Sequence, residues 1–448
     1  MAEFIMKGKD IPRYRKNPIL KTMKKILIIV YYWPPAGGPG VQRWLKFVKY
    51  LPDFGFQPIV YVPDNPTYPI IDRSLESQIP QETIILRRKI FEPYGIASIF
   101  SRKKINKISS GIIPTKGNQT FLEKVALWIR GNLFIPDARI FWVKPSVKFL
   151  EKYINENCID TVVTSGPPHS LHLIGMALKA KTNFTWIADF RDPWTTIGYH
   201  DAMKLSKFSS RKHKDLERQV LNAADRIIVT SATTKDGFRE ITSKPIDVIT
   251  NGYDVAKIAG IKVDTKFSLS HIGSLLAGRN PKILWEALLE LLNELPTFKD
   301  FLQIYLIGAT SHEILDSIAK YRLGDYTEVT GYLSHADAVK RQQESQILLL
   351  IEIDSENTKR IIPGKLFEYM VSGRPILAIG PAGSDFSDII SETNIGIFVN
   401  YQEKDKLKIA ITNYFKLFLD GNLKVSAVGI EKYSRKSLTQ QLAAIINA

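Results

Sequence analysis

The sequence contains a single cysteine, Cys158, among its 448 residues. One cysteine cannot form an intramolecular disulfide, which excludes a fold held by internal disulfides and is typical of a reducing compartment. No run reaches the roughly 18 consecutive apolar residues that a membrane-spanning helix requires. The apolar stretch after Met23 is cut short by Pro34 and Pro35, with no small-residue cleavage site behind it, which disfavours a signal peptide. We therefore expect a cytoplasmic protein.

The composition is that of a folded globular protein, with 44% hydrophobic, 10% aromatic and 24% charged residues. A chain of this length exceeds what one hydrophobic core usually serves, so we expect two domains. The formal net charge of +16 is uneven: residues 1–150 hold 25 Lys and Arg against 10 Asp and Glu, which leaves 36 against 35 for the rest. Such a basic first third attracts anions, although a solvated basic surface without a specific partner remains an alternative.

Short apolar runs alternate with helical patterns along the whole chain. The runs expected to be strands are KILIIV, QPIVYV, IDTVVTS, FTWIAD and RIIVTS in the first half, and FSLSHIG, QIYLIG, ILLLI and RPILAI in the second. Strands separated by helices indicate βαβ units and parallel sheets that are buried on both faces. The sequence thus predicts an α/β protein with two doubly wound, Rossmann-like domains.

Turn residues suggest where the domains divide. A proline, an Asn-Gly pair and an aspartate interrupt the rhythm in SKPIDVITNGYD, residues 243–254. We expect an extension over residues 1–22, a first domain over 23–248, a second domain over 249–428, and a C-terminal helix within 429–448 that crosses back to the first domain.

Residues 34–40, PPAGGPG, hold three glycines and three prolines between the first expected strand and a helix that starts near Gly40. A glycine-rich turn at a helix start lets an anion approach the backbone N–H groups. Gly37, Gly38 and Gly40 therefore indicate a diphosphate or sugar contact. The loop is neither a Walker loop nor a complete G-x-G-x-x-G motif. The alternative is a tight connection that needs glycine only for its backbone angles.

The second half supplies a candidate partner site. In IIPGKLFEYMVSGRPILAIG, residues 361–380, a Pro-Gly turn precedes a helix that carries Glu368, whose carboxylate can accept bonds from the hydroxyls of a ribose. Upstream, Arg279 and Lys282 lie near the start of another helix and can hold phosphate oxygens. The alternatives are that Glu368 merely complements a helix dipole and that Arg279 and Lys282 are ordinary cations near a helix start.

Together these segments resemble bacterial glycosyltransferases of family 4 and their close relatives, which have the GT-B architecture. The resemblance covers roughly residues 23–448 and rests on an ordered set of segments: YYWPPAGGPGVQRW, TSGPPHSLHLIG, ADFRDPW, ADRIIVTS, ITNGYD, HIGSLLAGRNPK and IPGKLFEYMVSGRPI. It implies two Rossmann-like domains facing across a cleft, with a nucleotide-sugar donor held mainly by the second domain and the acceptor mainly by the first.

The resemblance also implies a retaining glycosyltransferase that needs no metal or other cofactor. It assigns the ribose to Glu368 and the diphosphate to Arg279 with Lys282 or Lys365, close to Gly364. The loop at Gly37 and Gly38 would close over the phosphates, and His169 would contact the hydroxyls of the donor sugar unless it serves only packing.

One position departs from the family pattern of a glutamate eight residues before Glu368, because Arg360 stands there. The donor sugar's contacts therefore cannot be carried over. We expect Arg360 to tolerate or favour a sugar with an acidic or acetamido group.

On the acceptor side, Asp189 ends the strand FTWIAD and Arg191 and Asp192 follow it, at the edge where open α/β sheets bind ligands. An aspartate there can orient the acceptor hydroxyl, and Arg191 can pair with an acceptor phosphate. The alternative is an internal Asp-Arg salt bridge. The basic, apolar segment 98–134 suits docking on an anionic membrane, which suggests a peripheral protein on the inner face of the cell membrane with a lipid-linked or saccharide acceptor.

We thus predict a glycosyltransferase of cell-surface polysaccharide biosynthesis. Two other readings stay open: a nucleotide-sugar epimerase of GT-B fold, and a non-catalytic scaffold that binds nucleotide sugar. Nucleic acid is not expected as a partner, because the sequence has no RNA-binding signature and no zinc pattern.

Overall fold

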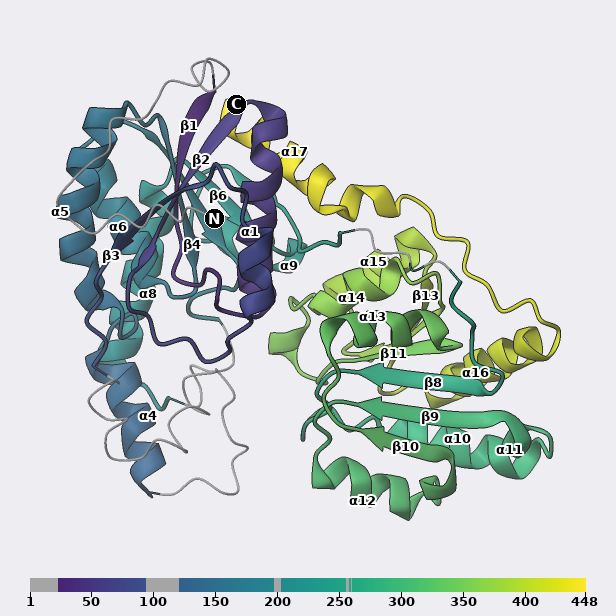
Figure 1. Ribbon diagram of the computed structural model, residues 1–448. Helices are drawn as coiled ribbons and strands as arrows, with labels where there is room; N and C mark the ends of the chain where they lie inside the picture. The colour runs from purple at the N-terminus through teal and green to yellow at the C-terminus, as the bar shows by residue number, and fades with distance from the viewer. Residues whose placement is uncertain (1–22, 94–120, 197–202, 255–257, 259) are drawn as a thin grey trace. The chain divides into compact units, whose positions relative to one another are not determined.

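The computed structural model describes the chain except residues 1–22, 94–120, 197–202, 255–257 and 259. The predicted extension over 1–22 and most of the basic segment 98–134 lie outside the described residues. The chain divides into two compact units (Figure 1): unit 1 comprises Met1–Thr250 and Arg435–Ala448, and unit 2 comprises Asn251–Ser434. The change of unit after Thr250 falls two residues beyond the predicted boundary.

Unit 1 is built on a seven-stranded sheet of order β3-β2-β1-β4-β5-β6-β7, in which every pair is parallel. Its strands are β1 (Lys24–Ile29), β2 (Phe56–Pro63), β3 (Ile84–Arg88), β4 (Thr161–Gly166), β5 (Thr185–Phe190), β6 (Arg226–Val229) and β7 (Ile246–Val248). Its helices are α1 (Pro39–Tyr50), α4 (Phe121–Leu133), α5 (Ile140–Asn157), α6 (Ser170–Lys179), α8 (Lys207–Ala223), α9 (Ala232–Arg239) and α17 (Arg435–Asn447), with 3-10 turns η2 (Leu51–Phe54) and η3 (Arg73–Gln78).

Successive residues of β1 point into two separate cores. Leu27 and Ile29 pack with side chains of α5, α6 and α8, whereas Ile26 and Ile28 pack with side chains of α1 and α17. Because side chains alternate along a strand, a sheet covered on both faces needs apolar residues at every position. The uninterrupted run KILIIV meets this need. The C-terminal helix α17 thus completes the core of unit 1.

Unit 2 repeats the plan with a six-stranded parallel sheet of order β10-β9-β8-β11-β12-β13. Its strands are β8 (Phe267–Ile272), β9 (Leu302–Ile307), β10 (Thr327–Thr330), β11 (Ile347–Ile351), β12 (Ile376–Gly380) and β13 (Gly396–Asn400). Its helices are α10 (Lys282–Glu294), α11 (Phe298–Phe301), α12 (His312–Lys320), α13 (His335–Glu344), α14 (Gly364–Met370), α15 (Asp385–Thr393) and α16 (Lys404–Leu419), with 3-10 turns η4 (Gly324–Tyr326), η5 (Glu356–Thr358) and η6 (Ile430–Tyr433).

These two sheets confirm the prediction of two Rossmann-like, doubly wound α/β domains. In each sheet the strand order reverses once, between β1 and β4 in unit 1 and between β8 and β11 in unit 2. Loops that leave the carboxyl ends of such neighbouring strands diverge to opposite faces and open a crevice, where α/β proteins bind ligands. The predicted site residues must be judged by their distance from these two points. Among the described residues, no helix is both long enough and apolar enough to span a bilayer.

Candidate functional site

Arg279 and Glu352 form an ion pair across the point of strand reversal in unit 2. Arg279 lies in the loop after β8, and Glu352 directly follows β11. The guanidinium donates from Nε to Glu352 Oε1 at 3.1 Å and from an Nη to Oε2 at 3.3 Å. Glu352 is 2% exposed, whereas the side chain of Arg279 is 34% exposed. A bidentate pair of this kind fixes the guanidinium plane while its remaining N–H groups face outward.

Lys365 adds a second cation to this cluster. It follows Gly364, the first residue of α14, and its Nζ lies 3.4 Å from Nε2 of His271 at the end of β8. Burial and the neighbouring Arg279 lower the pKa of Lys365 to about 8, although Glu352 and Glu368 act in the opposite direction. A partly buried lysine beside an arginine is costly unless an anion joins them. Glu352 and Glu368 supply counter-charge to this pair of cations.

Glu368 lies on α14, one turn after Lys365. Its Oε2 accepts a hydrogen bond from Nε2 of Gln342 at 3.2 Å, and the side chain is half-buried. A carboxylate in this setting keeps lone pairs for hydroxyl donors.

Two other predicted site residues, Lys282 and Arg360, lie at the start of α10 and in the turn before α14. Lys282 is exposed at the first position of α10 and lines a hollow of about 220 Å³. The other residues that line this hollow are Asn280, Glu313, Asp316, Ser317, Lys320 and Tyr321. Of the two lysines that the sequence left open, the structure brings Lys365 to Arg279. Arg360 is half-buried in the turn before α14.

The glycine-rich loop of unit 1 needs its glycines for packing and backbone geometry. A Cβ on Gly37 would lie 2.9 Å from Ile70, Gly38 has φ of +107° at the N-cap of α1, and a Cβ on Gly40 would collide with the guanidinium of Arg191. Each requirement is met by glycine without any ligand. The loop still ends at the N-terminus of a twelve-residue helix that has no side-chain cap and no acid in its first turn. Both readings from the sequence therefore stay compatible with the structure.

Arg191 and Asp192 lie next to this loop, after β5. The guanidinium of Arg191 donates to the carbonyl oxygens of Gly166 and Pro167, and it lies 6.0 Å from the ring centre of Tyr32. Burial raises the pKa of Asp192, against the effect of Arg191. A carboxyl with a raised pKa beside a cation at the sheet edge is a typical functional candidate.

Asp189 differs from its two neighbours, because it is fully buried. Its carboxylate accepts from an Nη of Arg43 at 3.0 Å, from Nε1 of Trp44 at 2.8 Å and from Oγ of Ser165 at 2.7 Å. These charge-assisted bonds lower the pKa of Asp189 despite its burial. The structure therefore shows the internal Asp-Arg salt bridge that was the alternative for this residue, with Arg43 as the partner. It offers no exposed oxygen to an acceptor.

His169 precedes α6 and is 4% exposed. Its ring stacks on Trp194, with centroids 5.0 Å apart and planes 3° apart. Trp194 is held in turn by His213, whose Nδ1 accepts from the indole N–H at 3.1 Å, and by Glu217, which accepts from the backbone N–H at 3.0 Å. The loop after β5 is thus pinned to α8, and it sets the orientation of His169.

The comparisons with known proteins agree with this architecture. Residues 113–257 match the model of Glycosyltransferase Family 4. The solved structures that resemble the chain include sucrose-phosphate synthase from Thermosynechococcus elongatus, with 14% identity, a TM-score of 0.56 and coverage of 95% of this chain and 98% of the other. Another is a mutant of S. aureus TarM in complex with Fondaparinux, alpha-GlcNAc-glycerol and UDP, with 13% identity, a TM-score of 0.57 and coverage of 95% and 100%.

The chain has the GT-B fold of glycosyltransferases. The same GT-B fold occurs in a putative UDP-N-acetylglucosamine 2-epimerase from Listeria monocytogenes, at 11% identity, a TM-score of 0.51 and coverage of 95% and 96%. A search of the curated proteins finds no match. The comparisons therefore support the GT-B prediction, and the chemistry has to be argued from the residues.

Three residues beside predicted site residues were not identified from the sequence: Glu352 and His271 in unit 2, and Trp194 in unit 1. Glu352 and His271 each stand at the carboxyl end of an apolar run, ILLLI and FSLSHIG. A polar residue at that place in a parallel strand is a usable signal for a site. Trp194 gave no such signal, because its partner His169 lies 25 positions away in the sequence.

Proposed function

We propose that the protein is a glycosyltransferase that moves a sugar from a nucleoside-diphosphate sugar to an acceptor. The observation that carries the proposal is the cluster of Arg279, Lys365 and Glu368 at the strand reversal of unit 2. Two partly buried cations suit a diphosphate, and a carboxylate one helical turn from Lys365 suits the hydroxyls of a ribose. Unit 2 would therefore hold the donor.

The chemistry follows from the charges. Breaking the bond between the sugar and the diphosphate leaves negative charge on the phosphate oxygens while positive charge develops on the sugar ring. Arg279, already fixed by Glu352, and the ammonium of Lys365 stabilise the departing oxygens without rearrangement. We propose that these cations act in place of a metal ion and that the anomeric configuration is retained. Transfer that proceeds unchanged with EDTA would agree with the first point.

In unit 1 we assign the acceptor to the edge formed by Arg191 and Asp192. Asp192 would orient the acceptor hydroxyl, since its carboxyl lies beside Arg191 and has a raised pKa. His169 would contact the donor sugar, with its ring held by Trp194. Asp189 does not bind the acceptor in this proposal, because its buried carboxylate oxygens already accept hydrogen bonds from Arg43 and Trp44.

Transfer assays with a panel of UDP- and GDP-sugars test the proposal. We expect Arg279→Ala to lower turnover by about 10²-fold or more, the scale of losing one preorganised charge contact. Lys416→Ala, which removes an exposed lysine from α16 in the same unit, is the matched control and should keep its activity. Near-native turnover of Arg279→Ala would refute the assigned role.

The same panel separates the two alternatives. An epimerase would convert a nucleotide sugar with no acceptor present, and a scaffold would bind one without turnover. The panel also tests Arg360, which we propose favours a donor with an acidic or acetamido group. If Arg360→Glu left the sugar preference unchanged, that idea would be lost.

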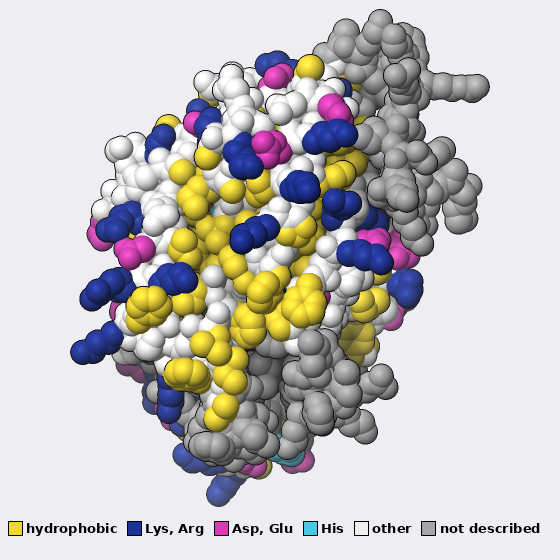
Figure 2. Space-filling model, turned by 90° about the vertical axis from the view of Figure 1, so that its left-hand side faces the viewer, with side chains coloured by type: hydrophobic (Ala, Val, Ile, Leu, Met, Phe, Trp, Pro, Cys, Tyr) yellow, Lys and Arg dark blue, Asp and Glu magenta, His cyan; other side chains and the backbone are white. Residues whose placement is uncertain are grey.

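Unit 1 also carries a surface suited to an anionic membrane. Helix α4 exposes Val125, Trp128, Ile129 and Leu133, the last of them 65% exposed. Figure 2 shows hydrophobic side chains gathered in a band on this side of unit 1, with Lys and Arg side chains along it. A stripe of exposed apolar and aromatic side chains flanked by cations is typical of interfacial helices.

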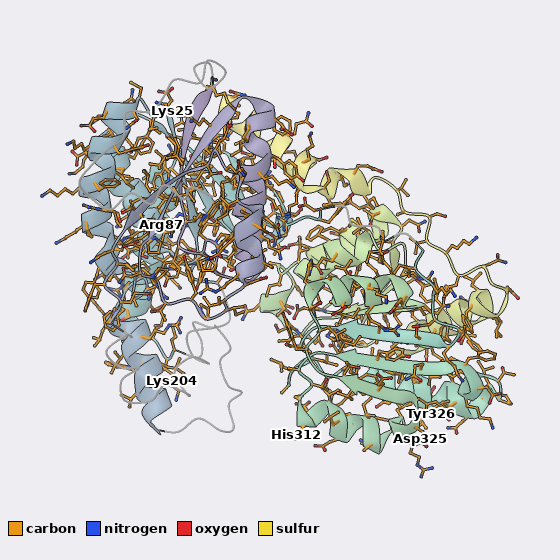
Figure 3. All side chains as sticks on the ribbon, viewed as in Figure 1. Lys25, Arg87, Lys204, His312, Asp325 and Tyr326 are labelled. Carbon is orange, nitrogen blue, oxygen red and sulfur yellow. The ribbon has the colours of Figure 1, made fainter. Side chains whose placement is uncertain are left out.

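Helix α8 supplies positive charge next to α4. Gly131 of α4 packs against Met203 and Leu205, and the labelled Lys204 lies beside α4 in Figure 3. Phe208, in the first turn of α8, is 74% exposed. The exposed cations of this stretch are Lys204, Lys207, Arg211, Lys212 and Lys214. Each basic residue near an anionic leaflet contributes about 1 kcal/mol. We therefore propose a peripheral position on the inner face of the cell membrane, with a lipid-linked acceptor in polysaccharide biosynthesis.

Flotation with phosphatidylglycerol and phosphatidylcholine vesicles tests this surface. We expect binding to phosphatidylglycerol at low salt, weakened by salt and by Lys207→Glu with Arg211→Glu. The matched control is Lys406→Glu with Lys416→Glu, which makes the same change of charge at exposed positions of α16 in unit 2. Equal flotation with neutral and anionic vesicles, or none with either, would favour a soluble saccharide acceptor.

A further inference from the structure

The end of β8 holds a buried histidine to which the proposed reaction assigns no task. His271 is 2% exposed, and both its ring nitrogens have neighbours. Nδ1 lies 3.2 Å from the carbonyl oxygen of Leu349 on β11, and Nε2 lies 3.4 Å from Nζ of Lys365 on α14. The ring thus connects the two strands at the reversal point with the lysine of the site.

The partners define where the ring proton lies. A carbonyl oxygen only accepts and an ammonium only donates. The proton therefore belongs on Nδ1, where it is donated to Leu349, and Nε2 keeps a lone pair for Lys365. The backbone of Ser274 also faces the ring, and burial with the nearby Lys365 and Arg279 lowers the pKa of His271 to about 3. The imidazole is consequently neutral throughout the physiological range.

The path of the lysine is defined just as closely. Gly273 has φ of +119°, and a Cβ there would collide with Cε and Nζ of Lys365. The lysine side chain therefore lies directly over the backbone of the loop after β8 and reaches His271. The charged groups that act on its ammonium are Arg279, Glu352 and Glu368.

We propose that His271 is a positioning residue for Lys365: its neutral ring accepts one ammonium N–H and directs the other two toward the diphosphate of the donor. This inference rests on the proposed function, because it takes the diphosphate as the anion at this site. His271 would thus fix the orientation of the Lys365 ammonium. Without an acceptor, an ammonium rotates freely and its N–H groups have no preferred direction.

Two variants separate the two nitrogens. In His271→Gln the side-chain amide reaches the Nε2 position and can accept from Lys365, whereas in His271→Asn it reaches only the Nδ1 position and serves Leu349. Inorganic pyrophosphate is the probe, measured by calorimetry between pH 6.5 and 9.5. We expect His271→Gln to bind within about twofold of the native protein and His271→Asn to bind about tenfold more weakly.

A second measurement follows the lysine itself. The pH dependence of reductive methylation of Lys365, read by mass spectrometry, should have a midpoint near 8 in the native protein and a lower one in His271→Asn, because the lost acceptor had stabilised the charged form. If pyrophosphate does not bind but this midpoint moves, the positioning role stands and the proposed function fails. If pyrophosphate binds and the midpoint does not move, the positioning role fails and the function stands.

Equal losses of binding in both variants would also overturn the inference, since they would indicate a packing role. Should His271→Asn not fold, nitrogen NMR of the native protein decides alone. We expect the Nδ1–H tautomer of His271, and a proton on Nε2 would contradict the proposal.

Discussion

Acid should destabilise both units through buried histidines, of which His172 and His271 have the most strongly lowered pKa values. His172 in unit 1 is fully buried, and its Nδ1 lies 2.8 Å from Oγ1 of Thr164, which also accepts from Nε1 of Trp186 at 3.0 Å. Burial, reinforced by Arg191, lowers the pKa of His172 from 6.5 to about 3, while Asp189 opposes the shift. His271 in unit 2 is lowered from 6.5 to about 3 as well.

The sign of the pH effect follows from proton binding. Below pH 6.5 each of these histidines binds a proton in the unfolded chain. In the folded chain the two imidazoles stay neutral down to about pH 3. The free energy of unfolding therefore falls with decreasing pH across this window. Each histidine contributes about 1.4 kcal/mol for every pH unit. Between neutral pH and pH 5 each of these two histidines contributes a loss of about 2 kcal/mol.

Urea unfolding at pH 7.5 and pH 5.0 measures this loss. Six of the seven tryptophans belong to unit 1 and Trp285 belongs to unit 2, so fluorescence follows mainly unit 1. The variant His172→Gln should lose about 2 kcal/mol less on acidification than the native protein, because glutamine has no proton to gain. The carboxyl groups contribute equally to the acid-induced loss of stability in both proteins, so their contribution cancels in the difference. If both lose the same stability, His172 is not a buried neutral group and the reasoning is wrong.

Two further predictions concern unit 1. Asp189→Asn should lower the free energy of unfolding by about 3 to 5 kcal/mol, since it leaves the charge of the buried Arg43 uncompensated. The double variant Arg43→Met with Asp189→Leu should recover most of this stability. A loss of transfer activity without a loss of stability would instead indicate that Asp189 binds the acceptor. Gly40→Ala should displace the guanidinium of Arg191 from its two carbonyl partners and cost about 2 kcal/mol. Gly237→Ala, within α9 where a Cβ meets open space, is the matched control and should stabilise by about 0.5 to 1 kcal/mol; equal effects of the two substitutions would remove the close-packing argument.

The sites depend on side chains whose partners lie far along the chain. Arg279 and Glu368 were identified from loops with a recognisable composition, and both lie in the site region of unit 2. Local composition could not tell Lys365 from Lys282, because both stand at the first turn of a helix. The structure distinguishes them by their surroundings, because Lys365 is half-buried beside His271 and Arg279 whereas Lys282 is exposed at the start of α10.

The same limit separates Asp189 from Asp192. Both are acids in ADFRDPW, Asp189 within β5 and Asp192 two residues after it, yet Asp189 is fully buried against Arg43 of α1 and Asp192 is not. Strand alternation alone predicts that neighbouring residues face different surroundings. Which surroundings contain a partner arginine is decided by a helix 146 positions earlier in the chain.

The amino-acid sequence alone was sufficient for the fold class and for the nine interior strands, because a strand covered on both faces is largely apolar, even where β8 carries the buried Ser268 and Ser270. The four strands that it did not reveal, β3, β7, β10 and β13, are the edges of the two sheets. An edge strand has a neighbour on one side only and tolerates polar residues, as in TEVT of β10, so its sequence carries little periodic signal. Pairing with an adjacent strand makes these segments part of a sheet, and only the folded chain supplies that neighbour.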